Sequence, residues 1–118
     1  MRLPTRGLSI MVALTAAAGI ASAQPPGLSE AQAIALGHDL VLRNCGMCHA
    51  TETTGTSPNA KAPPFRALGE RLDMDQLGEG LATGILTQHP AMPEFRFAPH
   101  EVVAIVRYLR TVQEKQKT

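Results

Sequence analysis

The pentapeptide Cys45-Gly46-Met47-Cys48-His49 constrains this chain more than any other part of the sequence. Its two thiols, separated by two residues, are spaced so that each can add across one of the two vinyl groups of a porphyrin. The imidazole that follows is then held beneath the ring, where one of its nitrogens can bind iron as the proximal ligand. Because Cys45 and Cys48 are the only cysteines, they do not belong to a larger disulfide framework. The motif therefore predicts one covalently attached haem c, with His49 as an iron ligand.

A C-x-x-C pair by itself is also compatible with a thioredoxin-like redox centre or with half of a zinc site. A thioredoxin-like domain requires the pair at the start of a helix that follows a strand. Residues 34–43, before the pair, instead have the pattern of the end of a helix. A zinc site requires four ligands, and neither a second C-x-x-C nor an H-x3-H pair follows. The sequence leaves both alternatives open and favours haem attachment.

The first residues have the pattern of an export signal. Two arginines form a positively charged start, residues 8–20 supply a short apolar run, and Ala21-Ser22-Ala23 is a small-residue cleavage site. We therefore expect residues 1–23 to be a signal peptide and residues 24–118 to be the mature domain. The alternative is an uncleaved membrane anchor. However, the apolar run of about 13 residues is shorter than the roughly 20 that span a bilayer, so no membrane span is expected after cleavage.

Charge and composition exclude several kinds of partner. The chain has eleven Lys and Arg against ten Asp and Glu, and loss of the two arginines of the signal leaves nine against ten, a formal charge of −1. This balance gives no indication of binding to nucleic acid or to an acidic membrane surface. A small domain without Trp and with few aromatic residues buries a limited apolar area. A porphyrin would supply the missing part of the core.

The mature domain is expected to be all-α, because no segment alternates like a strand. Ser29 begins the pattern of a capping box, and apolar residues at helical spacing then predict a helix over about residues 30–43 that leads into the C-x-x-C-H motif. At the other end, Pro99 and Glu101 suit the first turn of a helix, and residues 102–112 keep a helical period.

The segment between these two helices is expected to be mostly irregular. Residues 51–62 are rich in Thr, Ser, Gly, Pro and Asn without an apolar period, which predicts a loop. Residues 66–71 suit a short helix, and Asp73 is a suitable N-cap for a helix over residues 74–83, although two glycines weaken it. Residues 88–95 contain a proline at every third position, so they cannot form a regular helix.

Together these features resemble a class I cytochrome c, over almost the whole mature chain. The resemblance is strongest to small single-haem periplasmic cytochromes of alphaproteobacteria. It rests on the N-terminal helix running into C-x-x-C-H, the proline-containing loop, the late segment Met92-Pro93-Glu94-Phe95 and the amphipathic C-terminal helix. It implies the cytochrome c fold, in which the N- and C-terminal helices cross and short helices and loops wrap one covalently bound haem. It also implies export, since bacteria attach c-type haem outside the cytoplasm.

The resemblance assigns roles to individual residues. Cys45 and Cys48 correspond to the thioether cysteines, His49 to the proximal iron ligand and Met92 to the distal iron ligand. The family also uses a proline carbonyl to accept the Nδ1 proton of the proximal histidine, which fixes its tautomer and raises its basicity. Pro63 and Pro64 both fit this role, and the sequence does not distinguish them. Three arginines are candidates for pairing with the haem propionates, without preference among them: Arg66, Arg71 and Arg96.

The resemblance also implies a close helix crossing. Gly37 and Val41 correspond to the contact on the N-terminal helix, and Ile105 and Tyr108 to the contact on the C-terminal helix. The chain departs from the family in carrying Val41 where an aromatic residue is common. Two further histidines on these helices, His38 and His100, have the pattern of surface residues.

The distal ligand is expected to be Met92 because it lies in an extended, proline-flanked loop that can return over the ring. Met47 lies inside the haem motif, too close to reach the other face, and Met74 lies between two aspartates. His89 is the alternative, since imidazole also binds ferric iron. The choice matters because a thioether ligand stabilises ferrous iron, and axial ligation spans ≈ 0.8 V among haem proteins.

With His49 and Met92 both bound, the iron has no open position, so the resemblance implies a periplasmic one-electron carrier and not an enzyme. Its partners would be redox proteins, a dehydrogenase or an oxidase, that dock transiently at the haem edge. The family's ring of lysines is poorly represented, since the only lysines are Lys61, Lys115 and Lys117. Three alternatives stay open: a haem protein whose sixth site binds a gas or peroxide, a thiol–disulfide protein, and the electron-accepting subunit of a dehydrogenase.

Overall fold

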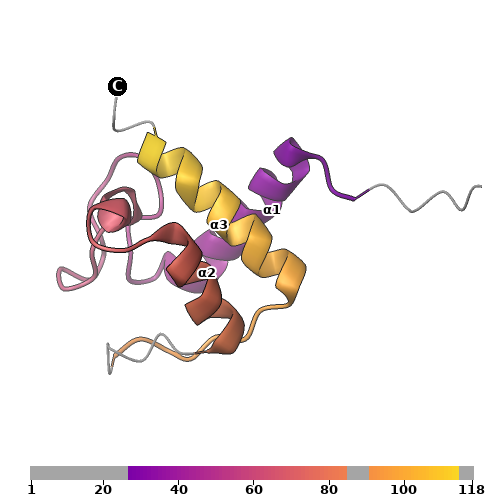
Figure 1. The fold of residues 1–118 in the computed structure, drawn as a ribbon. Helices are drawn as coiled ribbons and strands as arrows, with labels where there is room; N and C mark the ends of the chain where they lie inside the picture. The colour runs from indigo at the N-terminus through magenta and orange to yellow at the C-terminus, as the bar shows by residue number, and fades with distance from the viewer. Residues whose placement is uncertain (1–26, 85–90, 115–118) are drawn as a thin grey trace, which may run out of the picture.

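The computed structural model describes residues 27–84 and 91–114 (Figure 1). Within these residues the chain forms only helices and loops, without a strand, so the predicted all-α class is confirmed. The elements in chain order are α1 (Glu30–Cys45), the 3-10 helix η1 (Phe65–Glu70), α2 (Met74–Thr83) and α3 (Pro99–Glu114). The predicted signal peptide lies outside the described residues, as does the first part of the predicted non-helical segment 88–95. Residues 91–95, the described part of that segment, form no helix, as predicted.

Helix α1 begins where the capping box predicts. The Oγ of Ser29 accepts the backbone N–H of Gln32 at 3.2 Å, and Oε1 of Gln32 accepts the backbone N–H of Ser29 at 2.9 Å. These two bonds satisfy N–H groups that have no partner within the helix. The helix extends two residues beyond the predicted end and includes Cys45. The first cysteine of the motif is therefore held by helical backbone.

The starts of α2 and α3 also agree with their sequence signals. Oδ1 of Asp73 accepts the backbone N–H groups of Asp75 and Gln76 at 2.8 and 3.2 Å. At the start of α3, Oε2 of Glu101 accepts the backbone N–H of Ala98 at 2.8 Å. Helix α2 ends at a glycine with a left-handed backbone, φ 76°, which terminates the helix without steric strain.

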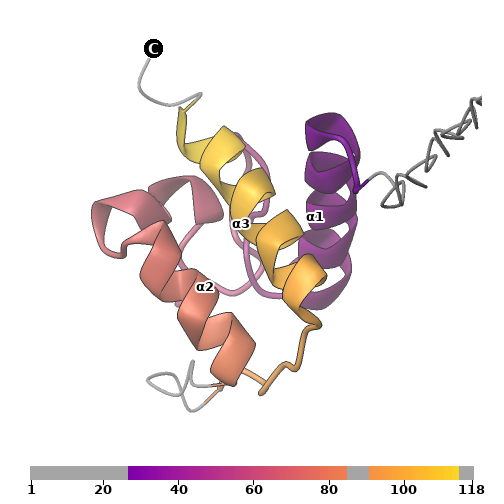
Figure 2. The ribbon, with the colours of Figure 1, turned by 45° about the vertical axis from the view of Figure 1, so that its right-hand side comes forward.

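Helix α3 is the organising element of the fold. It packs against α1, α2 and η1, and Figure 2 shows it running between α1 and α2. Its buried side chains form one core with residues of the other elements. This core consists of Leu40, Val41, Phe65, Leu77, Leu81, Val102, Ile105, Tyr108, Leu109 and Val112.

The crossing of α1 and α3 depends on Gly37. A Cβ placed on this glycine would lie 2.0 Å from the carbonyl oxygen of Ala104 and 2.9 Å from Cβ of Tyr108. The predicted crossing is therefore present, with Ala104 as a contact that the sequence did not indicate. Val41 is only 1 % exposed, so the smaller side chain at this position is fully packed. Ile105 is also buried.

Candidate functional site

The C-x-x-C-H motif continues the last turn of α1 as a tight turn. The carbonyl of Cys45 accepts the backbone N–H groups of Cys48 and His49 at 3.1 and 3.0 Å, and the N–H of Gly46 donates to the carbonyl of Leu42 at 3.2 Å. A Cβ on Gly46 would lie 2.5 Å from that Leu42 oxygen. A glycine at this position therefore lets the chain turn tightly against the end of the helix. The turn brings Cys45, Cys48 and His49 together at one end of α1.

The imidazole of His49 is anchored by the backbone of the proline-containing loop. Its Nδ1 donates to the carbonyl oxygen of Pro63 at 2.8 Å. Of the two prolines that fit this role in the sequence, the structure selects Pro63. A ring nitrogen that donates in this way leaves Nε2 as the nitrogen with a lone pair, which is the form that binds a metal ion. The bond also increases the basicity of the ring.

Phe65 is a second neighbour of the imidazole, and no pattern in the sequence predicts this contact. Its ring centroid lies 4.6 Å from that of His49, with 36° between the ring planes. Phe65 is 6 % exposed and belongs to the core. The imidazole is thus packed on one side by an apolar ring that is itself fixed.

Three hydrogen bonds hold the chain after the motif close to it, one to Cys48 and two to Ala50, the residue that follows His49. The carbonyl of Cys48 accepts the N–H of Asn59 at 3.1 Å, the N–H of Ala50 donates to Oγ of Ser57 at 2.9 Å, and the carbonyl of Ala50 accepts the N–H of Phe65 at 2.9 Å. The predicted irregular loop is confirmed as non-helical over residues 51–62. Although irregular, it is tied at several points to the residues that carry the chemistry.

The environment of Cys45 bears on the thiol–disulfide alternative. Burial raises the pKa of the Cys45 thiol from 9.0 to about 11. The nucleophile in thiol–disulfide exchange is the thiolate, and reactive pairs of this kind have a lowered pKa. At neutral pH the Cys45 sulfur is therefore a protonated, weakly reactive thiol, the opposite of what a redox disulfide centre requires.

The methionines of the described residues have different environments. Met47 is 86 % exposed at the tip of the motif. Met74 packs against the core and lines a groove between α2 and α3. Met92 lies half-buried in the non-helical segment before α3. Its predicted competitor as distal ligand, His89, lies outside the described residues.

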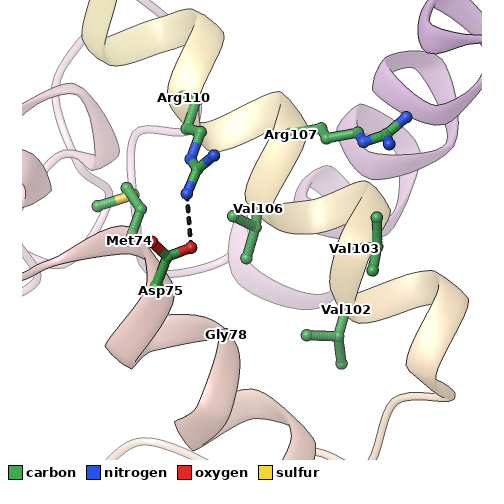
Figure 3. Close-up of a pocket in the computed structure, with 8 residues that line it drawn as sticks. All are labelled: Met74, Asp75, Gly78, Val102, Val103, Val106, Arg107 and Arg110. Carbon is green, nitrogen blue, oxygen red and sulfur yellow. Dashed lines mark hydrogen bonds and ion pairs between the residues drawn. The ribbon is translucent and has the colours of Figure 1, made fainter.

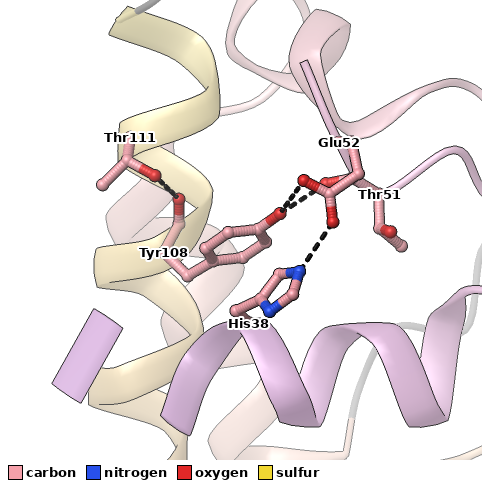
Figure 4. A network of polar contacts seen from close by, with 5 residues as sticks. All are labelled: His38, Thr51, Glu52, Tyr108 and Thr111. Atoms are coloured by element: carbon pink, nitrogen blue, oxygen red, sulfur yellow. Dashed lines mark hydrogen bonds and ion pairs between the residues drawn. The ribbon is translucent and has the colours of Figure 1, made fainter. Parts of the chain in front are cut away.

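A polar network links α1, the loop after the motif and α3 (Figure 4). The hydroxyl of Tyr108 donates to the carbonyl of Thr51 at 3.0 Å and to Oε2 of Glu52 at 3.1 Å. Oε1 of Glu52 lies 2.6 Å from Nε2 of His38, whose ring meets that of Tyr108 edge-on at 5.0 Å. His38 therefore has a structural partner, which the sequence did not predict. Burial raises the pKa of Tyr108 above its usual value, and the Glu52 carboxylate raises it further.

Replacement of Tyr108 by phenylalanine tests this network. The variant keeps the ring at the helix crossing but removes the donor, so we expect a loss of about 1–2 kcal/mol in the free energy of unfolding. A raised pKa means that the neutral hydroxyl is the form stabilised by folding. The hydrogen bonds of the Tyr108 hydroxyl therefore contribute fully to the free energy of unfolding below about pH 10. This contribution is lost as the pH rises toward the folded-state pKa. Urea unfolding at pH 7 and above pH 10 measures both effects, and an unchanged stability at pH 7 would contradict the account.

A groove of about 280 Å³ lies between α2 and α3 (Figure 3). Nη2 of Arg110 lies 2.6 Å from Oδ1 of Asp75 at its rim. The groove is lined by Met74, Asp75, Gly78, Val102, Val103, Val106, Arg107 and Arg110. None of the four residues predicted to bind haem or iron lines this groove.

Among the described residues, no group of three or more His, Cys, Asp and Glu side chains is placed to hold a metal ion. None of the described helices is both long enough and apolar enough to cross a membrane.

A small all-α domain, with a C-x-x-C-H turn closing its first helix and the imidazole fixed by a proline carbonyl, defines a c-type haem protein. The Cytochrome c family model matches residues 34–113, about two-thirds of the chain. The chain therefore belongs to the cytochrome c family, and it is a haem c electron-transfer protein. No curated protein and no solved structure shows significant similarity to it.

Membership of this family implies a covalently bound haem c, and the residues present fit that group. Two thiols stand at the required spacing, and the imidazole next to them offers Nε2 because Nδ1 is engaged by Pro63. The apolar ring of Phe65 lies beside the imidazole. The donor set is thus one nitrogen and two thioether-forming sulfurs from a single turn.

Proposed function

We propose that this protein is a periplasmic one-electron carrier with a single haem c, ligated by His49 and Met92 and attached through Cys45 and Cys48. In this proposal residues 1–23 are a cleaved signal peptide and residues 24–118 form a class I cytochrome c domain. The observation that carries the proposal is the hydrogen bond of 2.8 Å from Nδ1 of His49 to the Pro63 carbonyl. It prepares the imidazole beside the two cysteines as a metal ligand of fixed tautomer.

The chemistry that haem supplies when bound is the exchange of one electron between ferric and ferrous iron. The residues of the chain determine how easily that exchange occurs. His49 is restrained by Pro63 and by Phe65, so its ring does not reorient when the charge on iron changes. Met92 as a second permanent ligand would leave no position for a substrate. The protein therefore acts as a carrier, and redox partners would dock at the haem edge.

Among the alternative functions, the structure provides evidence on the thiol–disulfide hypothesis. The raised pKa of the Cys45 thiol makes that sulfur a poor nucleophile at neutral pH. A thioether bond to haem, once formed, needs no thiolate. The environment of Cys45 therefore does not favour thiol–disulfide exchange.

The substitution Met92→Ala tests the distal ligand. Loss of the thioether should abolish the weak red charge-transfer band that sulfur ligation gives the ferric protein, and should open the sixth position to carbon monoxide in the ferrous protein. The reduction potential should fall by on the order of 0.2 V, a fraction of the roughly 0.8 V that axial ligation spans. The absorption spectrum and a redox titration of the purified variant measure these changes.

Met74→Ala is the matched control, because Met74 is also half-buried but packs against the core near α3. This control should keep the charge-transfer band and the potential, with only a moderate loss of stability. A band that persists in Met92→Ala would show that another residue is the sulfur ligand. A band absent from the unsubstituted protein would point to His89.

A further inference from the structure

The side-chain amide of Gln113, near the end of α3, spans the 3-10 helix η1. Its Oε1 accepts the backbone N–H of Gly69 at 3.0 Å. Its Nε2 donates to the carbonyl of Phe65, a residue 48 positions away in the sequence, and more weakly to the carbonyl of Leu109 at 3.3 Å. One half-buried amide thus holds η1 near both of its ends.

The held segment is the one that fixes the imidazole of His49. The carbonyl of Pro63 accepts the Nδ1 proton of His49, and the ring of Phe65 packs on the imidazole. Pro64 stands between them as the N-cap of η1, with φ −64° and ψ 142°, and its carbonyl accepts the N–H of Ala67 at 3.0 Å. Because proline fixes φ, a shift of η1 would be transmitted to the Pro63 carbonyl.

The geometry at Gln113 requires a side chain that both donates and accepts. The acceptor faces the N–H of Gly69 and the donor faces the carbonyl of Phe65. The approach is also close, since a Cβ on Gly69 would lie 3.1 Å from Oε1 of Gln113. A carboxylate could not donate, and an apolar side chain could do neither.

We propose that Gln113 is a positioning residue for the iron ligand His49, acting through η1. This inference rests on the proposed function, in which His49 binds haem iron. By holding Phe65 and the adjoining Pro63, Gln113 sets the orientation of the imidazole and the strength of its Nδ1–H···O bond. A strong bond of this kind makes the imidazole more basic and favours ferric iron. Release of η1 should weaken the bond and raise the reduction potential.

The test compares the holoprotein with two variants, Gln113→Ala and Gln113→Met. The methionine variant keeps most of the side-chain volume and removes both hydrogen bonds to η1, which protects the test against simple unfolding. Both variants should show a more positive reduction potential and a changed pattern of haem methyl shifts in the ferric NMR spectrum. Exchange of the His49 Nδ1 proton with solvent, measured by NMR of the ferrous protein, should accelerate by about tenfold.

Two controls separate positioning from stability. Gln76→Ala replaces an exposed glutamine on α2, and should leave all three readouts unchanged. Val102→Ala removes buried volume from α3 and should lower the denaturant midpoint without moving the potential or the methyl shifts.

The outcomes are distinct. The inference is supported if the reduction potential and the haem methyl shifts change in both Gln113 variants and in neither control. A shift in Gln113→Ala alone would show that packing and not hydrogen bonding matters, and would overturn it. If the unsubstituted protein has haem ligated by histidine but both Gln113 variants keep its reduction potential and methyl shifts, only this inference is overturned. An unsubstituted protein without histidine-ligated haem would overturn the proposed function and the inference together.

Discussion

Gly37→Ala is expected to destabilise the protein by about 3 kcal/mol or more, the largest loss of stability that we predict for a substitution outside the haem motif. The new Cβ would lie 2.0 Å from the carbonyl oxygen of Ala104 and 2.6 Å from its carbonyl carbon. Backbone atoms of a packed helix cannot rotate away, so α1 and α3 would have to separate along their whole contact. The expected result is a lower denaturant midpoint for the holoprotein and a smaller yield of it.

The direction of the change in stability distinguishes a close helix contact from helix propensity alone. Alanine is the better helix former by about 1 kcal/mol, so without a close contact the substitution would stabilise α1. Gly27→Ala is the control, because no atom lies within 4 Å of a Cβ built there. If Gly37→Ala were as stable as this control, the tight crossing would be wrong.

Cys48→Ala is expected to remove most of the mature holoprotein, because only one thioether bond can then form. Any haem protein recovered should give a pyridine haemochrome spectrum shifted to longer wavelength, as expected for a porphyrin that retains one vinyl group. Without haem the remaining core is small, so we expect the polypeptide to be largely unfolded. Yield, haemochrome spectrum and helical circular dichroism measure these three effects.

Met47→Ala serves as the control within the same motif. Met47 lies between the two cysteines in sequence but is 86 % exposed, so its removal should change neither yield nor haemochrome spectrum. A normal yield and a two-thioether spectrum for Cys48→Ala would exclude Cys48 from haem attachment. A cooperative, helical, haem-free protein would contradict the expected dependence of folding on haem.

The helices were predictable from the sequence because their signals are local. The capping box at Ser29, the N-cap at Asp73 and the first turn at Pro99 each act within four residues, and each start is where the pattern indicates. The sequence also predicts a short helix over residues 66–71, and the structure has a 3-10 helix there that begins one residue earlier.

The contacts that support the candidate site were not predictable, because they join residues far apart in the sequence. Tyr108 and Thr51 are separated by 57 positions, and Gln113 and Phe65 by 48. A polar side chain on a helix surface gives no signal of which distant backbone group it will meet. The choice of Pro63 over Pro64 is of the same kind, since two adjacent carbonyls are equivalent until the chain has folded.

We propose above all that this chain carries one six-coordinate haem c with His49 and Met92 as ligands. The most direct test is the absorption spectrum of protein exported from a strain with cytochrome c maturation machinery, recorded oxidised, reduced, and reduced under carbon monoxide. We expect sharp α and β bands in the reduced protein that carbon monoxide does not change. A colourless protein, or a reduced spectrum altered by carbon monoxide at neutral pH, would contradict it.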